Sequence, residues 1–499
     1  MSTVYLSQTS TIITLILTTV TFAGIGILYS RGKGTIGSYL TADRSIGRKS
    51  LCASLVASCF GVWILIGPSE AATWGGLGAV IGYALGQALP FLAFITIGKR
   101  MRNIMPEGNS LTEFVLVRFG STMFKLVLFL SFFYMFVYLC AEVTAIAKIT
   151  NLISGFPLWQ TSLLIIVSTL AYTLYGGLRA SIFTDKIQFI IIFIFLLIAI
   201  NQVFVAEANN FSIELIKEKA GTLISGKYFY GYTAGLTFFI AVFATNLFDQ
   251  GIWQRVYAAK SNKDLEIAFI SAFFIILPFL IVLGFFGILA VTLGNAKDPS
   301  TVFFSLILNP MDGYNSLLTI SILVLALSLV ISSMDTLINA ISSLFIINGN
   351  KFLKLSSKGL RELSYYLIIA LSIVVFIIAS EGYSVLFMFL FADLLCCAAV
   401  FPIFFGMFNK NVTQKLGFIS VIAGLISGLA LFPNQTFEKS LLVGKLLQLE
   451  IFPLWISTAL LFWSFILATF VPLLLIILFN KQDTIFNFNK IKKIVKKIN

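Results

Sequence analysis

Hydrophobic residues in this chain come in long runs separated by short polar segments. Most runs are close to the roughly 20 residues that an α-helix needs to cross a bilayer. We expect thirteen spanning helices, near residues 11–29, 51–74, 78–98, 123–149, 158–176, 187–206, 231–251, 265–293, 315–348, 364–380, 383–407, 415–433 and 450–479. The pattern therefore predicts an all-α polytopic membrane protein, with residues 1–30 kept as its first span because no charged segment precedes that run.

Basic residues fall mainly in alternate loops between these runs. If the carboxyl terminus is cytoplasmic, 27 of the 34 lysines and arginines lie in loops on that side, six lie in loops on the other side, and Lys148 lies within a span. Cytoplasmic loops are enriched in basic residues, so we expect an N-out, C-in protein of a bacterial inner membrane. The basic tail at 490–497 then marks the anionic cytoplasmic leaflet rather than an RNA-binding segment.

Two expected spans contain residues that interrupt a membrane helix. Gly61, Gly67 and Pro68 lie within 51–74, and polar residues from Asn246 to Asp249 lie within 231–251, five helices later. Because five is odd, the second set of five helices must run inverted relative to the first, as in many secondary transporters. This divides the chain into a first span with its basic loop, a first repeat, an inverted second repeat and two extra spans with a basic tail, at 1–50, 51–206, 231–407 and 408–499.

Composition argues against several classes of function. Only 11% of residues are charged and 59% are hydrophobic, and the chain has no histidine, which removes the commonest general base and transition-metal ligand. The five cysteines lie in apolar stretches without the spacing of a zinc site, and no Walker A motif is present. We therefore expect no enzyme, no cofactor, no nucleic-acid partner and no obligate protein partner.

Several motifs resemble the sodium:solute symporter family, whose members are similar to the leucine transporter in fold. The most specific are Tyr175–Gln188 (YGGLRASIFTDKIQ) and Asp249–Lys260 (DQGIWQRVYAAK), and 38–47, 111–120 and 331–336 support them. The resemblance covers roughly residues 35–430. It implies sodium-coupled uptake of a small solute by alternating access, with sodium as the coupling ion.

The resemblance also implies where the cations bind. Alignment to the family places one sodium, without any charged ligand, between three carbonyls and two hydroxyls, those of Ala57, Phe60, Leu329, Ser332 and Ser333. In some relatives a second sodium lies at the positions that match Asp185, Asp335 and Thr336. Ser332 and Ser333 have an alternative role, because serines in membrane helices often donate to the preceding turn.

Charged residues inside the membrane each need an explanation, because such a charge costs roughly 2.5–3.5 kcal/mol on insertion scales. We expect gating roles for Glu70 at the outer vestibule and for Asp249 and Arg255 at the inner end of span 7. Asp393 lies in span 11, a helix that carries substrate or gating groups in the family, and is expected to have a gating role. The alternatives are a passive hydrated Glu70, a helix cap for Asp249 and Arg255, and a backbone partner at a kink for Asp393. Lys148 is expected to reach the outer surface.

The expected substrate pocket lies where the two interrupted spans meet. Its residues are Cys59, Gly61, Trp63, Asn246 and Glu142. Ile64 and Thr245 replace polar and tyrosine positions of the family's sugar carriers, which disfavours a sugar, and Cys59 and Gly61 depart from the proline carriers. An amino acid or small organic acid suits the pocket, whereas a sodium-independent facilitator or channel, or a membrane sensor, are the alternative functions.

Overall fold

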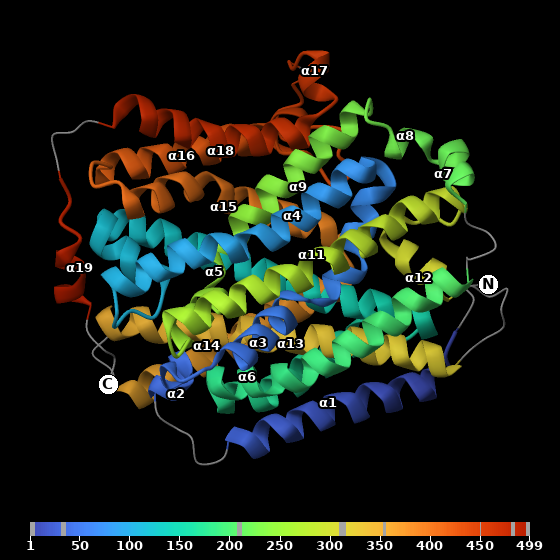
Figure 1. Cartoon of the computed structure of the whole chain (residues 1–499), viewed down its shortest axis with the longest axis horizontal. Helices are drawn as coiled ribbons and strands as arrows, with labels where there is room; N and C mark the ends of the chain where they lie inside the picture. The colour runs from blue at the N-terminus through green and yellow to red at the C-terminus, as the bar shows by residue number, and fades with distance from the viewer. Residues whose placement is uncertain are drawn as a thin grey trace.

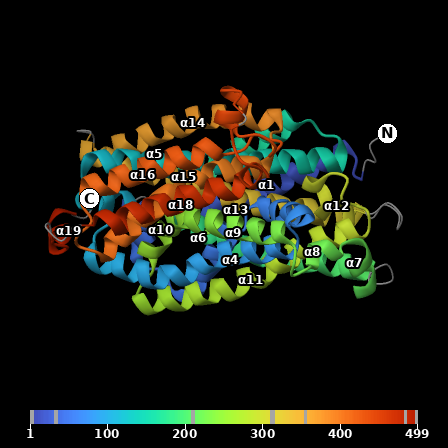
Figure 2. The ribbon, with the colours of Figure 1, turned by 90° about the horizontal axis from the view of Figure 1, so that it is seen from above.

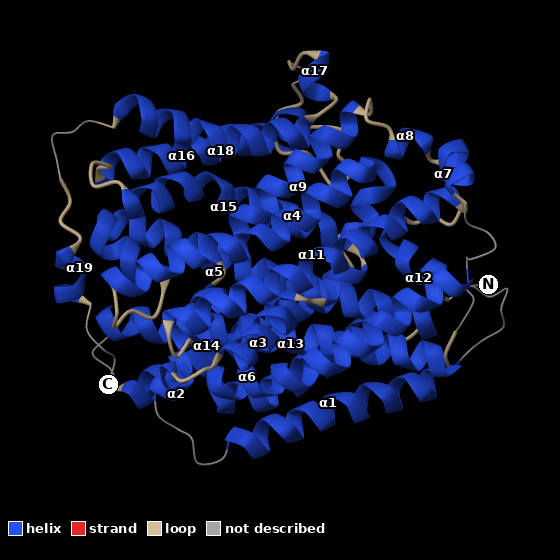
Figure 3. Ribbon diagram, viewed as in Figure 1, coloured by secondary structure: helices blue, strands red, loops and turns tan. Residues whose placement is uncertain are grey.

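The computed structural model describes residues 5–30, 36–206, 212–308, 316–352, 356–449, 451–480 and 485–495. These residues form helices with no strand, apart from the isolated bridges Ile46–Ala259 and Pro433–Ser440 (Figure 3). In order, the helices are α1 (Gln8–Ser30), α2 (Ile36–Thr41), η1 (Ala42–Arg44), α3 (Arg48–Cys59), η2 (Val62–Leu65), α4 (Gly67–Ile104), α5 (Leu111–Ser154), α6 (Leu158–Ala206), α7 (Ile213–Lys219), α8 (Gly221–Ile224), α9 (Phe229–Phe248), α10 (Gln250–Ala258), α11 (Asn262–Thr292), η3 (Pro299–Thr301), α12 (Val302–Ile307), α13 (Ser316–Phe352), α14 (Ser357–Glu381), α15 (Val385–Phe408), α16 (Gln414–Leu431), η5 (Leu441–Leu446), α17 (Leu454–Ser457), α18 (Leu460–Phe479) and α19 (Asn489–Ile494).

Eleven helical segments of the described residues are long and apolar enough to cross a membrane. The expected span 158–176 contains a shorter apolar helix, Leu158–Ala171, and the expected span 51–74 is divided between α3, η2 and the start of α4. The all-helical membrane architecture is therefore confirmed. The number of thirteen crossings stays a prediction.

The long helices run roughly along one common direction in both views (Figures 1 and 2). Helix α1 packs against α6 on one side of the bundle, while α16 and α18 pack together on the opposite side (Figure 1). The beginning of α1 and the short helix α19 lie at opposite ends of the long axis (Figure 1). This placement agrees with termini on opposite membrane faces, and which face is cytoplasmic stays a prediction.

Helix α4 is a hairpin rather than one straight helix. At Gly76 the backbone leaves helical geometry, with φ 55° and ψ −149°. On a straight helix, residues 67 and 83 would be about 24 Å apart, yet a Cβ built on Gly67 would lie 2.8 Å from the Tyr83 hydroxyl oxygen. The expected spans 51–74 and 78–98 therefore meet at this glycine, whose positive φ most residue types do not adopt readily.

Helix α6 is divided in the same way at Gly177, with φ 59° and ψ −166°. This glycine belongs to the motif Tyr175–Gln188, and a Cβ on it would lie 2.4 Å from Cδ2 of Tyr39. The motif thus places a bend between the expected spans 158–176 and 187–206, with α2 packed against it.

Two interrupted helices lie at the centre of the molecule. The first consists of α3, η2 and the start of α4, with its break between Phe60 and Ile66. The second consists of α9 and α10, with its break at Asp249. Span 7 was expected to end at residue 251, but the chain continues as helix to Ala258, so the expected inner end is the middle of a broken helix. Each break leaves backbone groups without their usual helical partners.

Candidate functional site

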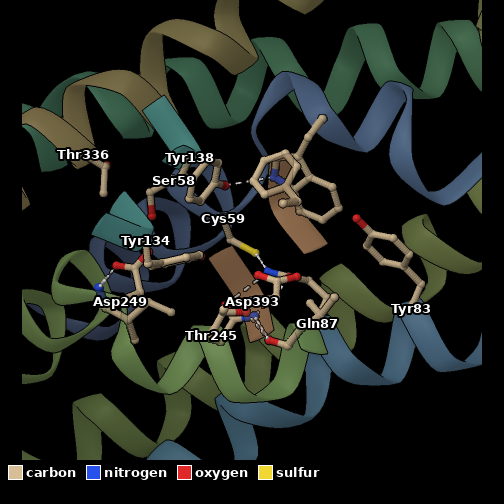
Figure 4. A pocket seen from close by; sticks show the side chains of 15 residues that line it. Ser58, Cys59, Tyr83, Gln87, Tyr134, Tyr138, Thr245, Asp249, Thr336 and Asp393 are labelled. Carbon is tan, nitrogen blue, oxygen red and sulfur yellow. Dashed lines mark hydrogen bonds between the residues drawn. The ribbon is translucent and has the colours of Figure 1, made fainter. Parts of the chain in front are cut away.

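A small internal cavity of about 40 Å³ lies where the two broken helices meet α4, α5 and α15. Such a volume holds two or three water molecules, so the walls must separate to admit a larger solute. The residues that line it are Ser58, Cys59, Trp63, Tyr83, Gln87, Tyr134, Tyr138, Val242, Thr245, Asn246, Asp249, Ile252, Thr336, Phe389 and Asp393 (Figure 4).

Aromatic rings form much of this lining. Trp63 stacks on Tyr83 with ring centroids 5.6 Å apart and meets the edge of Phe389 at 6.2 Å. Its indole Nε1 donates to the Tyr138 hydroxyl at 2.9 Å, and Tyr134 lies one helical turn from Tyr138. The cavity is therefore walled by faces and edges of rings that pack on one another.

Two aspartates supply the charge of the lining. Asp249 sits in the break between α9 and α10, where its Oδ1 accepts from Ile252 N at 3.0 Å. Asp393 of α15 is 5% exposed, and no described lysine or arginine forms an ion pair with either carboxylate. Among the described residues that line the cavity, none is basic. The described lining therefore holds two acidic side chains and no basic one.

Polar side chains join the two broken helices across the cavity. Gln87 Nε2 donates to Cys59 Sγ at 2.7 Å, and the Gln87 and Asn246 side-chain amides bond to each other at 3.1 and 3.3 Å (Figure 4). Asn246 Nδ2 also donates to Val242 O at 2.8 Å. This network connects α3, α4 and α9 directly.

The cavity lining includes only part of the expected substrate pocket. Cys59, Trp63 and Asn246 line the cavity as expected. Gly61 and Glu142 are not among its lining residues, because the Glu142 carboxylate turns toward the helix break and lies directly over Gly61. The expected contact of Glu142 and Gly61 with the solute stays a prediction.

Two expected gating residues also have different surroundings. Asp249 and Asp393 both line the cavity, and their expected gating roles stay a prediction. Asp249 additionally caps α10, which was the alternative interpretation of its role. Both carboxylates are therefore positioned to contact a solute.

A second, larger cavity of about 450 Å³ is lined in part by the same broken helix and by α15. Its lining includes Ile66 and Val385, which lie three and four residues from Trp63 and Phe389 of the first cavity. The acidic residues Glu70, Asp298 and Glu381 line it together with Lys148. The expected vestibule position of Glu70 fits this arrangement, and a gating role stays a prediction.

The first expected cation site surrounds the break after α3. Gly61 N donates to Cys59 O and Phe60 N donates to Val56 O, so the usual donors to the Ala57 carbonyl are directed elsewhere. Ile64 N donates to Gly61 O and Trp63 N donates to Glu142, which frees the Phe60 carbonyl in the same way. Freed carbonyls are suitable ligands for sodium.

The two serines of α13 expected at this site each donate to a buried carboxylate. Ser332 Oγ donates to Asp185 Oδ1 at 2.8 Å, and Ser333 Oγ lies 2.5 Å from Glu142 Oε2. Ser333 also contacts the Leu329 carbonyl at 3.1 Å. Two acidic residues therefore flank the expected uncharged ligands, and the ligand set itself stays a prediction.

The second expected cation site overlaps an internal ion pair. Arg255 Nη2 contacts Asp185 Oδ2 at 2.8 Å and the Thr336 hydroxyl at 3.0 Å, and both charged side chains are fully buried. Ser54 also donates to Asp185, and Asp335 accepts from Asn339 Nδ2 at 2.8 Å. Arg255 therefore ties α3, α6 and α13 to α10, and a second sodium between Asp185, Asp335 and Thr336 stays a prediction.

Sequence reasoning missed most of the aromatic lining. Tyr134 and Tyr138 precede Glu142 at intervals of four residues, which places all three on one face of α5. Gln87 is a polar side chain in an otherwise apolar span. Both signals are visible in the sequence, whereas Tyr83 and Phe389 have none that separates them from ordinary lipid-facing or core residues.

Comparison with known proteins identifies the family. The model of the sodium:solute symporter family matches residues 39–424. The chain belongs to this family. As a member, it is a multi-pass membrane transporter, in agreement with the resemblance noted from its motifs.

Individual relatives of this symporter differ in what they carry. It is 27% identical over 408 residues to the spermidine transporter DUR31 of Candida albicans. This alignment covers 80% of this chain and 75% of the relative. It is 29% identical over 294 residues to the sodium/glucose cotransporter of Vibrio parahaemolyticus, covering 52% and 51%. A solved structure of a Na⁺-coupled sialic acid symporter superimposes with a TM-score of 0.67 at 15% identity, covering 93% of this chain and 98% of that one. That likeness supports the leucine-transporter-like fold.

Proposed function

We propose that this protein is a sodium-coupled symporter that imports a small organic amine, carried as a cation. The observation that carries the proposal is the central cavity, which has Asp249 and Asp393 in its wall, five aromatic rings around them and no basic residue among the described lining. Membership of the sodium:solute symporter family supports the coupling to sodium.

The lining suits a positive charge for two physical reasons. A buried carboxylate without a basic partner is stabilised when a cationic group binds beside it. Ammonium groups are also attracted to the faces of tryptophan and tyrosine rings, and this attraction grows when water is excluded. An amine between Asp393 and the Trp63–Tyr83 pair satisfies both.

This solute differs from the amino acid or small organic acid that the sequence favoured. A carboxylate on the solute would face two aspartates and find no described lysine or arginine in the wall. The name of the Candida albicans relative, a spermidine transporter, is consistent with an amine. The other relatives' names include glucose, so family membership alone does not select the solute.

The proposed sodium ligands are those that the family resemblance implied. The carbonyls of Ala57 and Phe60 come from the broken helix, and Leu329, Ser332 and Ser333 come from α13. An ion here would join the helix that forms the cavity wall to its neighbour. Such a link would let sodium favour the conformation that binds the solute. We propose that transport takes place in a bacterial inner membrane, with the basic loops in the cytoplasm.

Uptake into proteoliposomes tests the function. Purified protein would be assayed with radiolabelled choline, putrescine, spermidine, proline, lactate and glucose, with and without an inward sodium gradient. We expect at least one amine to accumulate only with the gradient. Equal uptake without sodium would indicate a facilitator, and no uptake of any solute would favour a sensor. Accumulation of lactate in preference to every amine would overturn the assignment of solute class.

A further inference from the structure

The hydroxyl of Ser333 lies near more oxygen acceptors than it can donate a hydrogen bond to. It lies 2.5 Å from Glu142 Oε2, 3.1 Å from Leu329 O and 3.1 Å from Val330 O. A serine hydroxyl has one proton, so it can donate to only one of these three oxygens. Ser333 and Glu142 are both buried, at 1% and 0% exposed, so water does not reach these oxygens. A small cation at this position would have oxygen ligands already gathered around it.

Glu142 places a carboxylate here that forms no ion pair with any described lysine or arginine. Its side chain is fully buried, and none of the ion pairs formed by described residues includes it. Asp185, on the other side of Ser332, differs because it pairs with Arg255 and accepts from Ser54 and Ser332. Of the two acidic residues beside the expected sodium site, only Glu142 lacks a counter-ion of the protein's own.

The same carboxylate holds the broken helix. Glu142 Oε2 accepts from Val62 N at 2.8 Å, and Oε1 accepts from Trp63 N at 3.2 Å. Gly61 makes this approach possible, because a Cβ built there would lie 2.4 Å from Glu142 Oε1. One carboxyl group therefore contacts both a serine of the expected sodium site and the backbone of Trp63, which lines the solute cavity.

We propose that Glu142 is an anionic ligand of the coupling sodium and that it links the ion to the solute cavity through the Val62–Trp63 backbone. The proposal rests on the sodium coupling proposed above. It replaces the uncharged site implied by family resemblance with a charged one, in which the Ser333 hydroxyl, the Leu329 carbonyl and the Glu142 carboxylate, which lie within 3.1 Å of that hydroxyl, are oxygen ligands of the sodium. When the ion binds, it attracts the Glu142 carboxylate. The contacts of this carboxylate with the Val62 and Trp63 amides then transmit its movement to Trp63.

Direct sodium binding tests the ligand role without measuring transport. Equilibrium binding of ²²Na⁺ to purified protein in lipid nanodiscs would be compared between the wild type, Glu142→Gln and Glu266→Gln. The glutamine at 142 keeps an oxygen acceptor but removes the charge, so we expect the sodium Kd to rise at least tenfold. Glu266→Gln removes a surface carboxylate that pairs with Lys99, and its Kd should stay within twofold. A folded Glu142→Gln protein with wild-type sodium affinity would overturn the proposal.

A second variant covers the case in which Glu142→Gln does not fold. Gly61→Ala leaves the charge in place but pushes a methyl group into the carboxylate, so sodium affinity should also fall. An unchanged Kd in this variant would likewise contradict the proposal, provided that gel filtration shows a single folded species.

The link to the cavity has its own measurement. Sodium should change the tryptophan fluorescence of the wild type, and this change should be lost in both Trp63→Phe and Glu142→Gln. A sodium response that survives in Glu142→Gln would remove the proposed link. If the wild type itself binds no sodium, the coupling ion proposed for the transporter fails too, whereas equal binding by wild type and Glu142→Gln rejects only the role of Glu142.

Discussion

The buried acidic side chains near the centre of this symporter differ in their partners. Asp185 pairs with Arg255, and Asp335 accepts from Asn339 and Thr184. Glu142 accepts only from amides and a hydroxyl, and Asp393 lines the cavity without an ion pair to any described residue. Among the described residues, these two acidic side chains without an ion pair lie at the proposed sodium site and at the proposed solute cavity.

Replacing Asp393 tests the cationic solute. Asp393→Asn keeps the size of the side chain but removes its charge, so we expect the apparent affinity for an amine to fall about tenfold or more, since a desolvated charge pair is lost. The measurement is concentration-dependent amine uptake at saturating sodium. As a control, Glu438→Gln removes an exposed carboxylate on the loop after α16. Affinity that is equal in both variants would place the amine elsewhere.

The two serines of α13 are predicted to control sodium dependence. Ser332→Ala and Ser333→Ala each remove one of about five oxygens expected around the ion. We expect the sodium concentration for half-maximal uptake to rise at least several-fold in each variant. Ser328→Ala is a matched control, because Ser328 donates to Val324 O within its own helix. Unaltered sodium dependence in both Ser332→Ala and Ser333→Ala would exclude this site.

Asp335 tests whether a second ion is carried. If sodium binds between Asp185, Asp335 and Thr336, then Asp335→Asn should lower the Hill coefficient for sodium from about two to about one. Arg255 already neutralises Asp185 in this conformation, so the ion would have to bind mainly on the Asp335 side. A Hill coefficient of about one for sodium in the wild type would contradict a second sodium between Asp185, Asp335 and Thr336.

Among whole elements, α4 and α9 approach each other very closely next to the cavity. Cβ atoms built on Gly78 and Gly82 would lie 2.0 Å from the carbonyl oxygens of Gly231 and Gly235. Small residues at four-residue spacing let membrane helices approach in this way, and van der Waals contact then replaces the hydrophobic effect that lipid does not supply. This contact holds the helix that carries Gln87 against the helix that carries Asn246.

A single methyl group should therefore disturb this contact. Gly82→Ala is expected to destabilise the folded protein by about 1–3 kcal/mol, as overpacking does in tightly packed interiors. The measurement is thermal unfolding of the purified protein in detergent. Gly24→Ala is the control, since a Cβ there meets nothing within 4 Å. Equal melting temperatures of the two variants would contradict the close contact.

For the molecule as a whole, the arrangement of helices places two breaks at one point. The breaks at Phe60–Ile66 and at Asp249 are nearly 190 residues apart along the chain, and both contribute to the cavity lining. Matching broken helices that meet at one site are what an inverted repeat predicts. The repeat boundaries 51–206 and 231–407 themselves stay a prediction.

The orientation in the membrane is the prediction that belongs to this scale. We expect the amino terminus on the periplasmic side and the carboxyl terminus in the cytoplasm, because the 27 basic residues of the alternate loops hold that face inside. Fusions of alkaline phosphatase and green fluorescent protein to each end report the two sides. Fluorescence from an amino-terminal fusion would contradict the orientation and the count of thirteen spans together.

The sequence was sufficient for the architecture, because lipid imposes simple rules on it. Long apolar runs must become helices, since each backbone group needs a partner inside the bilayer. Gly61, Gly67 and Pro68 interrupt such a run, and this local chemistry correctly indicated the first break. The signature around Tyr175–Gln188 likewise indicated the family before any contact was known.

What the sequence by itself determined was therefore the helical membrane architecture, the family, and the positions of the intramembrane polar residues along the chain. Only the tertiary structure decided which of them meet. Glu142 lies over Gly61 rather than in the cavity, and Arg255 reaches Asp185, because helix rotation and crossing set these contacts between residues 70 or more positions apart. An apolar surface surrounds most of each span, so periodicity does not show which face turns inward. Packing between helices makes that choice, and it places Asp249 and Asp393 around one cavity.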